Sequence, residues 1–180
     1  MKVWKLNFEL DNYDNLISIP PFSIEDINEL DGRRLLGKWQ TRKVVRMEPE
    51  KNLPLGDAPG FTIPVFSERA LCYLRELIRE NIEELPLECS ENNYYAINVI
   101  NVLDAIDYQK SEYKTYRDGK RIMLFIKYCF KEDIVKDVSI FKIVDERRRS
   151  IFVSDQFKKI VEYNNLKGFK FELAWDSDNE

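Results

Sequence analysis

The chain has 180 residues, of which 44% are hydrophobic and 33% are charged, and its formal net charge at pH 7 is −4. This length and composition predict one globular domain with a sizeable core, and the acidic balance excludes a global electrostatic attraction to nucleic acid or to an anionic membrane. The sequence contains no histidine, which removes the commonest general base and metal ligand at neutral pH.

The cysteines and the N-terminus indicate a reduced, cytoplasmic setting. Cys72, Cys89 and Cys129 are odd in number and form no C-x-x-C pattern, so they predict free structural thiols. No segment approaches the roughly 20 apolar residues of a membrane helix. Residues 1–10 alternate in polarity like a strand and lack the apolar run of a signal peptide.

The first third of the chain predicts short elements between irregular segments. We expect strands over residues 2–10 and 35–45, and a short helix over residues 23–30 that begins at a serine. Residues 11–21 are polar and end in two prolines, so we expect no regular structure there. Four prolines and two glycines predict a long ordered loop over residues 46–64.

Two amphipathic helices are predicted, and each begins at a serine that an acid follows. Ser67 and Ser154 can each accept a hydrogen bond from an unpaired backbone N–H group at the helix start. We expect the first helix over residues 67–83 and the second over residues 154–164. The apolar stripe of the first helix consists of Ala70, Leu71, Leu74, Leu77, Ile78 and Ile82.

The remaining segments predict strands. Residues 94–103 are strongly β-prone, with a bend at Asn98 or Asn101. The Asp118-Gly119 pair predicts a hairpin turn, and its second arm, residues 122–130, is apolar enough to lie in the centre of a sheet. Another hairpin is expected from residues 139–144 and 150–153. In the last strand we expect one buried face, formed by Phe169, Phe171, Leu173 and Trp175.

These elements predict an α+β fold. A mostly antiparallel twisted β-sheet would carry the two amphipathic helices on one face, because both helices have one apolar side to bury. Residues 65–180 would form this core. Residues 1–64 would form an N-terminal strand and loop region that adds an edge strand or a small subdomain.

The strongest charge asymmetry is a run of acids between residues 80 and 109, a segment that contains no lysine or arginine. Its members are Glu80, Glu83, Glu84, Glu88, Glu91, Asp104 and Asp107. An acidic surface of this kind could receive a basic protein partner and speed the encounter with it. The alternative is that these acids are solvated and only keep the protein soluble.

One constellation admits an enzyme as an alternative. Asp104, Asp107 and the Glu112-Tyr-Lys114 triplet resemble the layout of some nucleases, in which carboxylates hold Mg²⁺ and a lysine stabilises negative charge on phosphate. Such a pattern also arises by chance in a charged chain. The sequence has no glycine-rich phosphate loop, and it predicts no cofactor.

Four short blocks, in a fixed order, resemble the immunity protein 11 family of bacterial polymorphic toxin systems. They are Phe66-Ser-Glu-Arg-Ala70; Glu84-Leu-Pro-Leu87; Tyr94-Tyr-Ala-Ile-Asn98 with Asp104 and Asp107; and Ile140-Phe-Lys142 with Phe152-Val-Ser-Asp155 and Gly168-Phe-Lys-Phe171. Together they cover roughly residues 39–175.

The resemblance implies a cytosolic, non-catalytic protein that binds and neutralises a cognate toxin. It brings no catalytic, cofactor or metal residues, and no toxin-contact residues. A metal-dependent nuclease or other hydrolase, using Asp104, Asp107, Glu112 and Lys114, remains the alternative. A small-molecule-sensing module is a third possibility without a residue pattern of its own.

Overall fold

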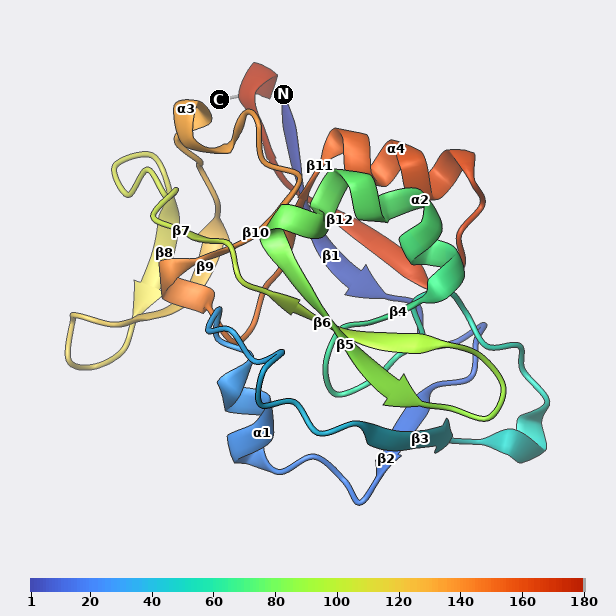
Figure 1. Ribbon diagram of the computed structural model, residues 1–180. Helices are drawn as coiled ribbons and strands as arrows, with labels where there is room; N and C mark the ends of the chain where they lie inside the picture. The colour runs from blue at the N-terminus through green and yellow to red at the C-terminus, as the bar shows by residue number, and fades with distance from the viewer. Residues whose placement is uncertain (180) are drawn as a thin grey trace.

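The computed structural model describes residues 1–179, and in them the chain forms two five-stranded sheets, a separate two-stranded ribbon and four α-helices. Antiparallel neighbours predominate in all three sheets, and the two longest helices lie side by side over the sheets (Figure 1). The predicted α+β class is therefore confirmed, although the strands divide between two main sheets.

The first sheet joins both ends of the chain. Its strands are β1 (Lys2–Phe8), β7 (Val102–Leu103), β10 (Ile140–Ile143), β11 (Phe152–Ser154) and β12 (Phe169–Asp176). They run in the order β12-β1-β11-β10-β7, with β10 and β7 parallel and the other neighbours antiparallel. The expectation of an edge strand at the N-terminus is wrong for β1, because this strand lies between β12 and β11 and pairs with both. Its Val3 and Leu6 side chains enter different hydrophobic cores.

The second sheet has the order β2-β3-β5-β6-β4. Its strands are β2 (Leu16–Ile19), β3 (Arg42–Arg46), β4 (Val65–Ser67), β5 (Ile82–Glu88) and β6 (Tyr94–Val99). The sequence reading missed β2, in which Leu16 and Ser18 point inward while Ile17 and Ile19 stay exposed. The strand predicted over residues 35–45 begins only at Arg42. The predicted loop over residues 46–64 is confirmed, with one 3₁₀ turn at Pro49–Lys51.

Helices α2 (Glu68–Ile78) and α4 (Asp155–Tyr163) pack against each other and close the central core. This core takes Phe66, Ile97 and Val99 from the second sheet and Leu6 and Val153 from the first. The two short helices, α1 (Ile24–Glu29) and α3 (Glu132–Val135), lie apart from α2 and α4 (Figure 1). The prediction of two amphipathic helices on one face of the strands is confirmed.

Helix α2 ends at Ile78, five residues before the predicted end. A 3₁₀ turn at Arg79–Asn81 follows, and β5 begins at Ile82. Ile82 does reach the central core, but from the strand, where it pairs with Val99. Residues 82–87 pair one by one with β6, and this strand pairing overrides the helical spacing on which the prediction relied.

The last strand also differs from its prediction. Phe169 and Phe171 pack against the central core as expected. A β-bulge opposite Val3 and Trp4 then shifts the register, so that Val3 pairs with Trp175 and Trp4 with Leu173. An extra residue in one strand reverses the side on which the following side chains point. Trp175 therefore enters the core on the opposite face, with Val3, while Leu173 is 46% exposed.

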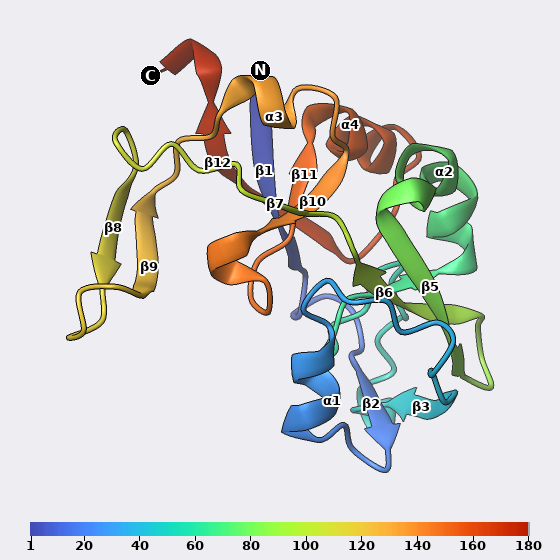
Figure 2. The same cartoon turned by 60° about the vertical axis from the view of Figure 1, so that its left-hand side comes forward.

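Both predicted hairpins form. Strand β6 ends at Val99, and Ile100 and Asn101 separate it from β7, in the segment where a bend was expected. Strands β10 and β11 pair as predicted. Strands β8 (Glu112–Thr115) and β9 (Ile122–Lys127) pair around Gly119, whose φ of 65° suits the turn. However, Figure 2 shows them as a separate ribbon that stands away from the two main sheets, so the central position predicted for β9 is wrong.

Residues 30–36, which we call the clamp segment, connect the two sheets through buried side chains. Lys142 of β10 is 4% exposed, and its Nζ donates to the carbonyl of Leu30. Asn98 of β6 donates through Nδ2 to the carbonyl of Arg33 at 2.8 Å. A carboxylate of β5 binds the backbone N–H groups further along the same segment. Each sheet therefore contributes a polar group to one stretch of backbone.

Replacing the two helix-capping serines provides a matched test. Ser67 and Ser154 accept from the third helical N–H at 3.0 and 3.2 Å, but Ser67 also donates to the buried carboxylate of Asp57 at 2.9 Å. We expect Ser154→Ala to lower the free energy of unfolding by about 1 kcal/mol. Ser67→Ala should cost about 1–2 kcal/mol more, because Asp57 loses a donor. Equal losses in urea unfolding would contradict a role for the Ser67–Asp57 bond.

Lys142 predicts a specific pH dependence of stability. Burial lowers the pKa of Lys142 from 10.5 to about 8, so the folded state disfavours its charged form. This cost is fully present below pH 8 and disappears as the pH rises to 10.5. We expect the stability of the wild type relative to Lys142→Met to rise by up to about 3 kcal/mol across that window. Urea unfolding at several pH values, with the exposed Lys43→Met as control, measures it; a flat difference would contradict the lowered pKa.

Candidate functional site

Glu83, one of the seven acids predicted to form a surface, is buried. It lies on β5 with 6% exposure. Its Oε2 accepts from the backbone N–H groups of Leu35 at 2.6 Å and Leu36 at 3.3 Å, and from Asn98 Nδ2 at 3.0 Å. Glu83 is therefore the carboxylate that holds the clamp segment, and these buried hydrogen bonds stabilise the fold.

Glu84 and Glu80 face arginines from α2 and the turn that follows it. Arg75 of α2 donates through Nε and Nη2 to the two oxygens of Glu84 at 2.8 and 2.9 Å. Arg75 also reaches Glu68 at 3.1 Å, and these hydrogen bonds raise the pKa of its guanidinium. Glu80 is exposed and lies 3.5 Å from Arg79. Two further acids are thus paired with cations of the same chain.

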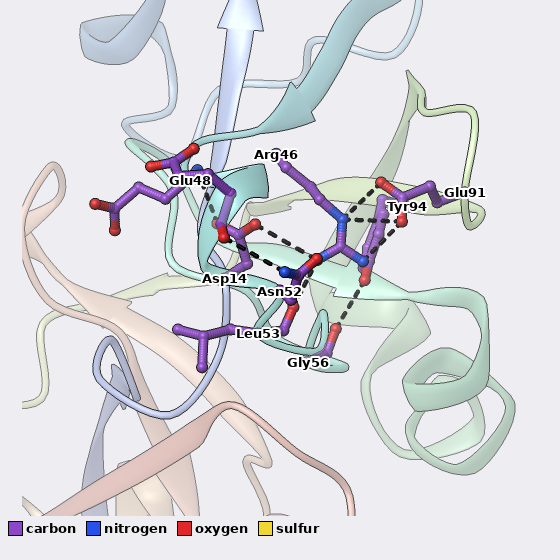
Figure 3. Close-up of polar contacts among 9 residues, drawn as sticks. Asp14, Arg46, Glu48, Asn52, Leu53, Gly56, Glu91 and Tyr94 are labelled. Carbon is purple, nitrogen blue, oxygen red and sulfur yellow. Dashed lines mark hydrogen bonds and ion pairs between the residues drawn. The ribbon is translucent and has the colours of Figure 1, made fainter.

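Glu91 belongs to a polar network that ties three segments together (Figure 3). Arg46 of β3 donates through Nε and Nη2 to the Glu91 carboxylate, at distances between 2.7 and 2.9 Å, and these bonds lower the pKa of Glu91. Arg46 Nη1 also donates to the Leu53 carbonyl at 2.6 Å and lies 3.4 Å from the buried Asp14. Glu91 therefore fastens the β5–β6 turn to β3 and to the loop after it.

Glu88, Asp104 and Asp107 are dispersed. Glu88 is exposed at the end of β5. Asp104 and Asp107 follow β7, which belongs to the other main sheet. Asp104 lies 3.9 Å from Lys131, and Asp107 accepts from the Gln109 N–H group at 3.0 Å. The structure thus does not bring the seven acids onto one strand or one sheet, and their role in partner binding stays a prediction.

The residues of the nuclease alternative do not converge either. Glu112 and Lys114 lie on the exposed strand β8, where Glu112 is opposite Lys127. Within residues 1–179, no three His, Cys, Asp or Glu side chains are grouped so that they could hold a metal ion. Asp104, Asp107 and Glu112 therefore form no such group.

The ribbon presents a surface that the sequence reading missed. Residues 110–127, which we call the basic arm, carry six cationic side chains and two carboxylates, a net charge of +4 in a chain whose net charge is −4. Large apolar side chains are exposed on it, among them Leu124 at 39% and Ile126 at 59%. The continuous apolar run of β9 was read as a buried strand. The signal that could have found this surface is the density of lysine and arginine on both sides of that run.

A groove lies beside the basic arm, between β9 and β12. It has a volume of about 650 Å³ and is lined by Lys127 and Tyr128 on one side and by Leu173, Ala174 and Asp176 on the other. β12 is the outermost strand of its sheet, and β9 pairs only with β8 in the described part of the chain. The groove therefore lies between the outermost strand of one main sheet and the C-terminal end of β9, which contributes only Lys127 to it.

No helix within residues 1–179 is both long and apolar enough to cross a membrane. No curated protein matches this chain in a sequence comparison. One family does: the description "Immunity protein family (Imm11)" belongs to a sequence profile that matches residues 3–176. The match spans both main sheets, the helices and the basic arm, and it extends the resemblance seen over residues 39–175 to the N-terminal strands. The chain belongs to the Imm11 immunity protein family.

Proposed function

We propose that this chain is a cytosolic, non-catalytic immunity protein that binds and neutralises a cognate toxin domain of a polymorphic toxin system. The observation that carries the proposal is the family match over residues 3–176. Neutralisation then requires a surface complementary to another polypeptide, either over the toxin's active site or at a position that obstructs its substrate or its motion.

The distribution of polar contacts supports this proposal. The best-connected polar groups are occupied within the chain: Glu83 holds the clamp segment, Arg46 joins Glu91 and Asp14, and Asp57 accepts from Ser67 and Arg69. Such contacts stabilise one shape of the scaffold. The groups left for an external function lie on the surface, as a binding protein requires.

We expect the gene immediately upstream to encode the cognate toxin domain, and the direct test uses that domain. We expect cells that express this domain to survive when this chain is co-expressed, and the two purified proteins to form a stable complex in sedimentation. Loss of toxin activity in vitro, when this chain is added in an equimolar amount, would show that binding itself inhibits the toxin. Absence of both rescue and complex, or turnover of a nucleic acid substrate by the purified chain with Mg²⁺, would contradict the proposal.

The predicted acidic contact surface is tested at its exposed members. If a basic toxin docks there, the Glu80→Lys/Glu88→Lys variant should associate about tenfold more slowly, and its association rate should depend less on salt. Glu83→Ala should behave differently, with lower stability and unchanged association, because its carboxylate is buried against Leu35 and Asn98. Stopped-flow association at two salt concentrations measures the rates. Unchanged association rates for the double variant would contradict a role for the acidic surface in toxin binding.

A further inference from the structure

The geometry points to the basic arm and the adjoining groove as the docking surface for a protein partner with an acidic surface. This inference rests on the proposed function in one respect, since it names the toxin domain as that partner.

The charge of the basic arm is largely uncompensated. Arg121 pairs with Asp118 at 2.8 Å. By contrast Lys114, Arg117, Lys120 and Lys127 form no ion pair with any residue in the range 1–179. The acids of β5 and its flanks differ, because Glu84 and Glu91 are matched by arginines. Complementary charge steers two proteins together, so the basic arm selects an acidic partner.

The apolar residues of the basic arm favour a protein over a nucleic acid. Leu124 and Ile126 alternate on the exposed face of β9, and Lys114 lies opposite Leu124 on β8. Aliphatic side chains bury well against another protein, whereas single-stranded nucleic acid is bound mainly by stacking on aromatic rings. The two exposed tyrosines of the arm, Tyr113 and Tyr116, are already packed against other side chains of the arm. An apolar centre surrounded by charged residues is the usual arrangement of a protein interface.

The arm is held in place before any partner binds. Arg149 donates to the Met123 carbonyl at 2.7 Å and to the Tyr116 hydroxyl at 3.2 Å. At the base, the Ser111 hydroxyl accepts from the Cys129 N–H at 2.9 Å and lies 3.2 Å from the Cys129 carbonyl. An isolated two-stranded ribbon is only marginally stable. The contacts of Arg149 and Ser111 order the basic arm before a partner binds, which lowers the entropic cost of binding.

The groove extends the surface. β12 is the outermost strand of its sheet, and the edge of such a strand can bind an extended segment of another protein. Leu173 and Ala174 supply apolar surface within it. An acidic partner segment that enters the groove would meet Lys127, while the Asp176 carboxylate in the same lining is paired with Lys2.

The experiment measures binding of the upstream-encoded toxin domain to full-length variants by biolayer interferometry. Lys114→Glu/Lys120→Glu should lower the association rate about tenfold and flatten its salt dependence. Leu124→Ser/Ile126→Ser should raise Kd about tenfold. The matched controls are Lys38→Glu/Lys43→Glu and Ile24→Ser, which change exposed residues away from the arm and should stay within twofold of the wild type. Thermal unfolding confirms that all variants fold.

Hydrogen exchange provides a second measurement. Slower exchange in Ile122–Lys127 and residues 173–176 on toxin binding would support the docking surface. Tight toxin binding with no effect of the arm variants, or with an effect of Glu80→Lys/Glu88→Lys alone, would overturn it and leave the proposed function standing. Failure of the wild type to bind the toxin would overturn the proposed function itself. Dimerisation through the arm, or retention of nucleic acid by it, would also overturn the inference.

Discussion

The fold depends on buried charged and polar side chains that hold the clamp segment between the two sheets. A buried ammonium or carboxylate group is costly unless hydrogen bonds satisfy it. Glu83 from β5 meets this condition on the backbone of residues 30–36, and Lys142 from β10 meets it in part, through the Leu30 carbonyl. Gly32 shows how closely the segment approaches, because its φ is +103° and an added Cβ would lie 2.2 Å from the Val102 side chain. A wrong docking of the sheets would leave both charges without partners.

A second junction, at Asp57, holds the other end of the scaffold. Its carboxylate accepts from Ser67 at the start of α2, from Arg69 at 2.6 Å and from the Lys167 N–H at 2.8 Å. The neighbouring Ala58 N–H donates to the Lys167 carbonyl. The long loop before β4 is thereby fixed to α2 and to the connection between α4 and β12. The predicted boundary between residues 64 and 65 stays a prediction, and hydrogen bonds such as these cross it.

What the sequence predicted well is local. The caps at Ser67 and Ser154 depend on atoms three residues away, and the Asp118-Gly119 turn depends on one dipeptide, so both can be read from a short stretch. The end of α2, the face to which Trp175 points and the burial of Glu83 depend instead on strand pairing, a bulge and backbone N–H groups 48 residues away. No window of sequence contains those partners. The run of acids shows the same limit, since Arg75 and Arg46, which pair with Glu84 and Glu91, lie on other elements.

The net charge of −4 does not show which charges a partner would meet. Net charge is a sum over the whole chain, whereas an approaching protein responds to charges within about 8–10 Å, the screening length at physiological salt. Near β5 the acids are partly cancelled by Arg75 and Arg46, but the basic arm keeps most of its positive charge. The surface potential that a partner meets is thus decided by which charges the fold has already paired. In this chain the fold has paired more of its acids near β5 than of its lysines on the ribbon.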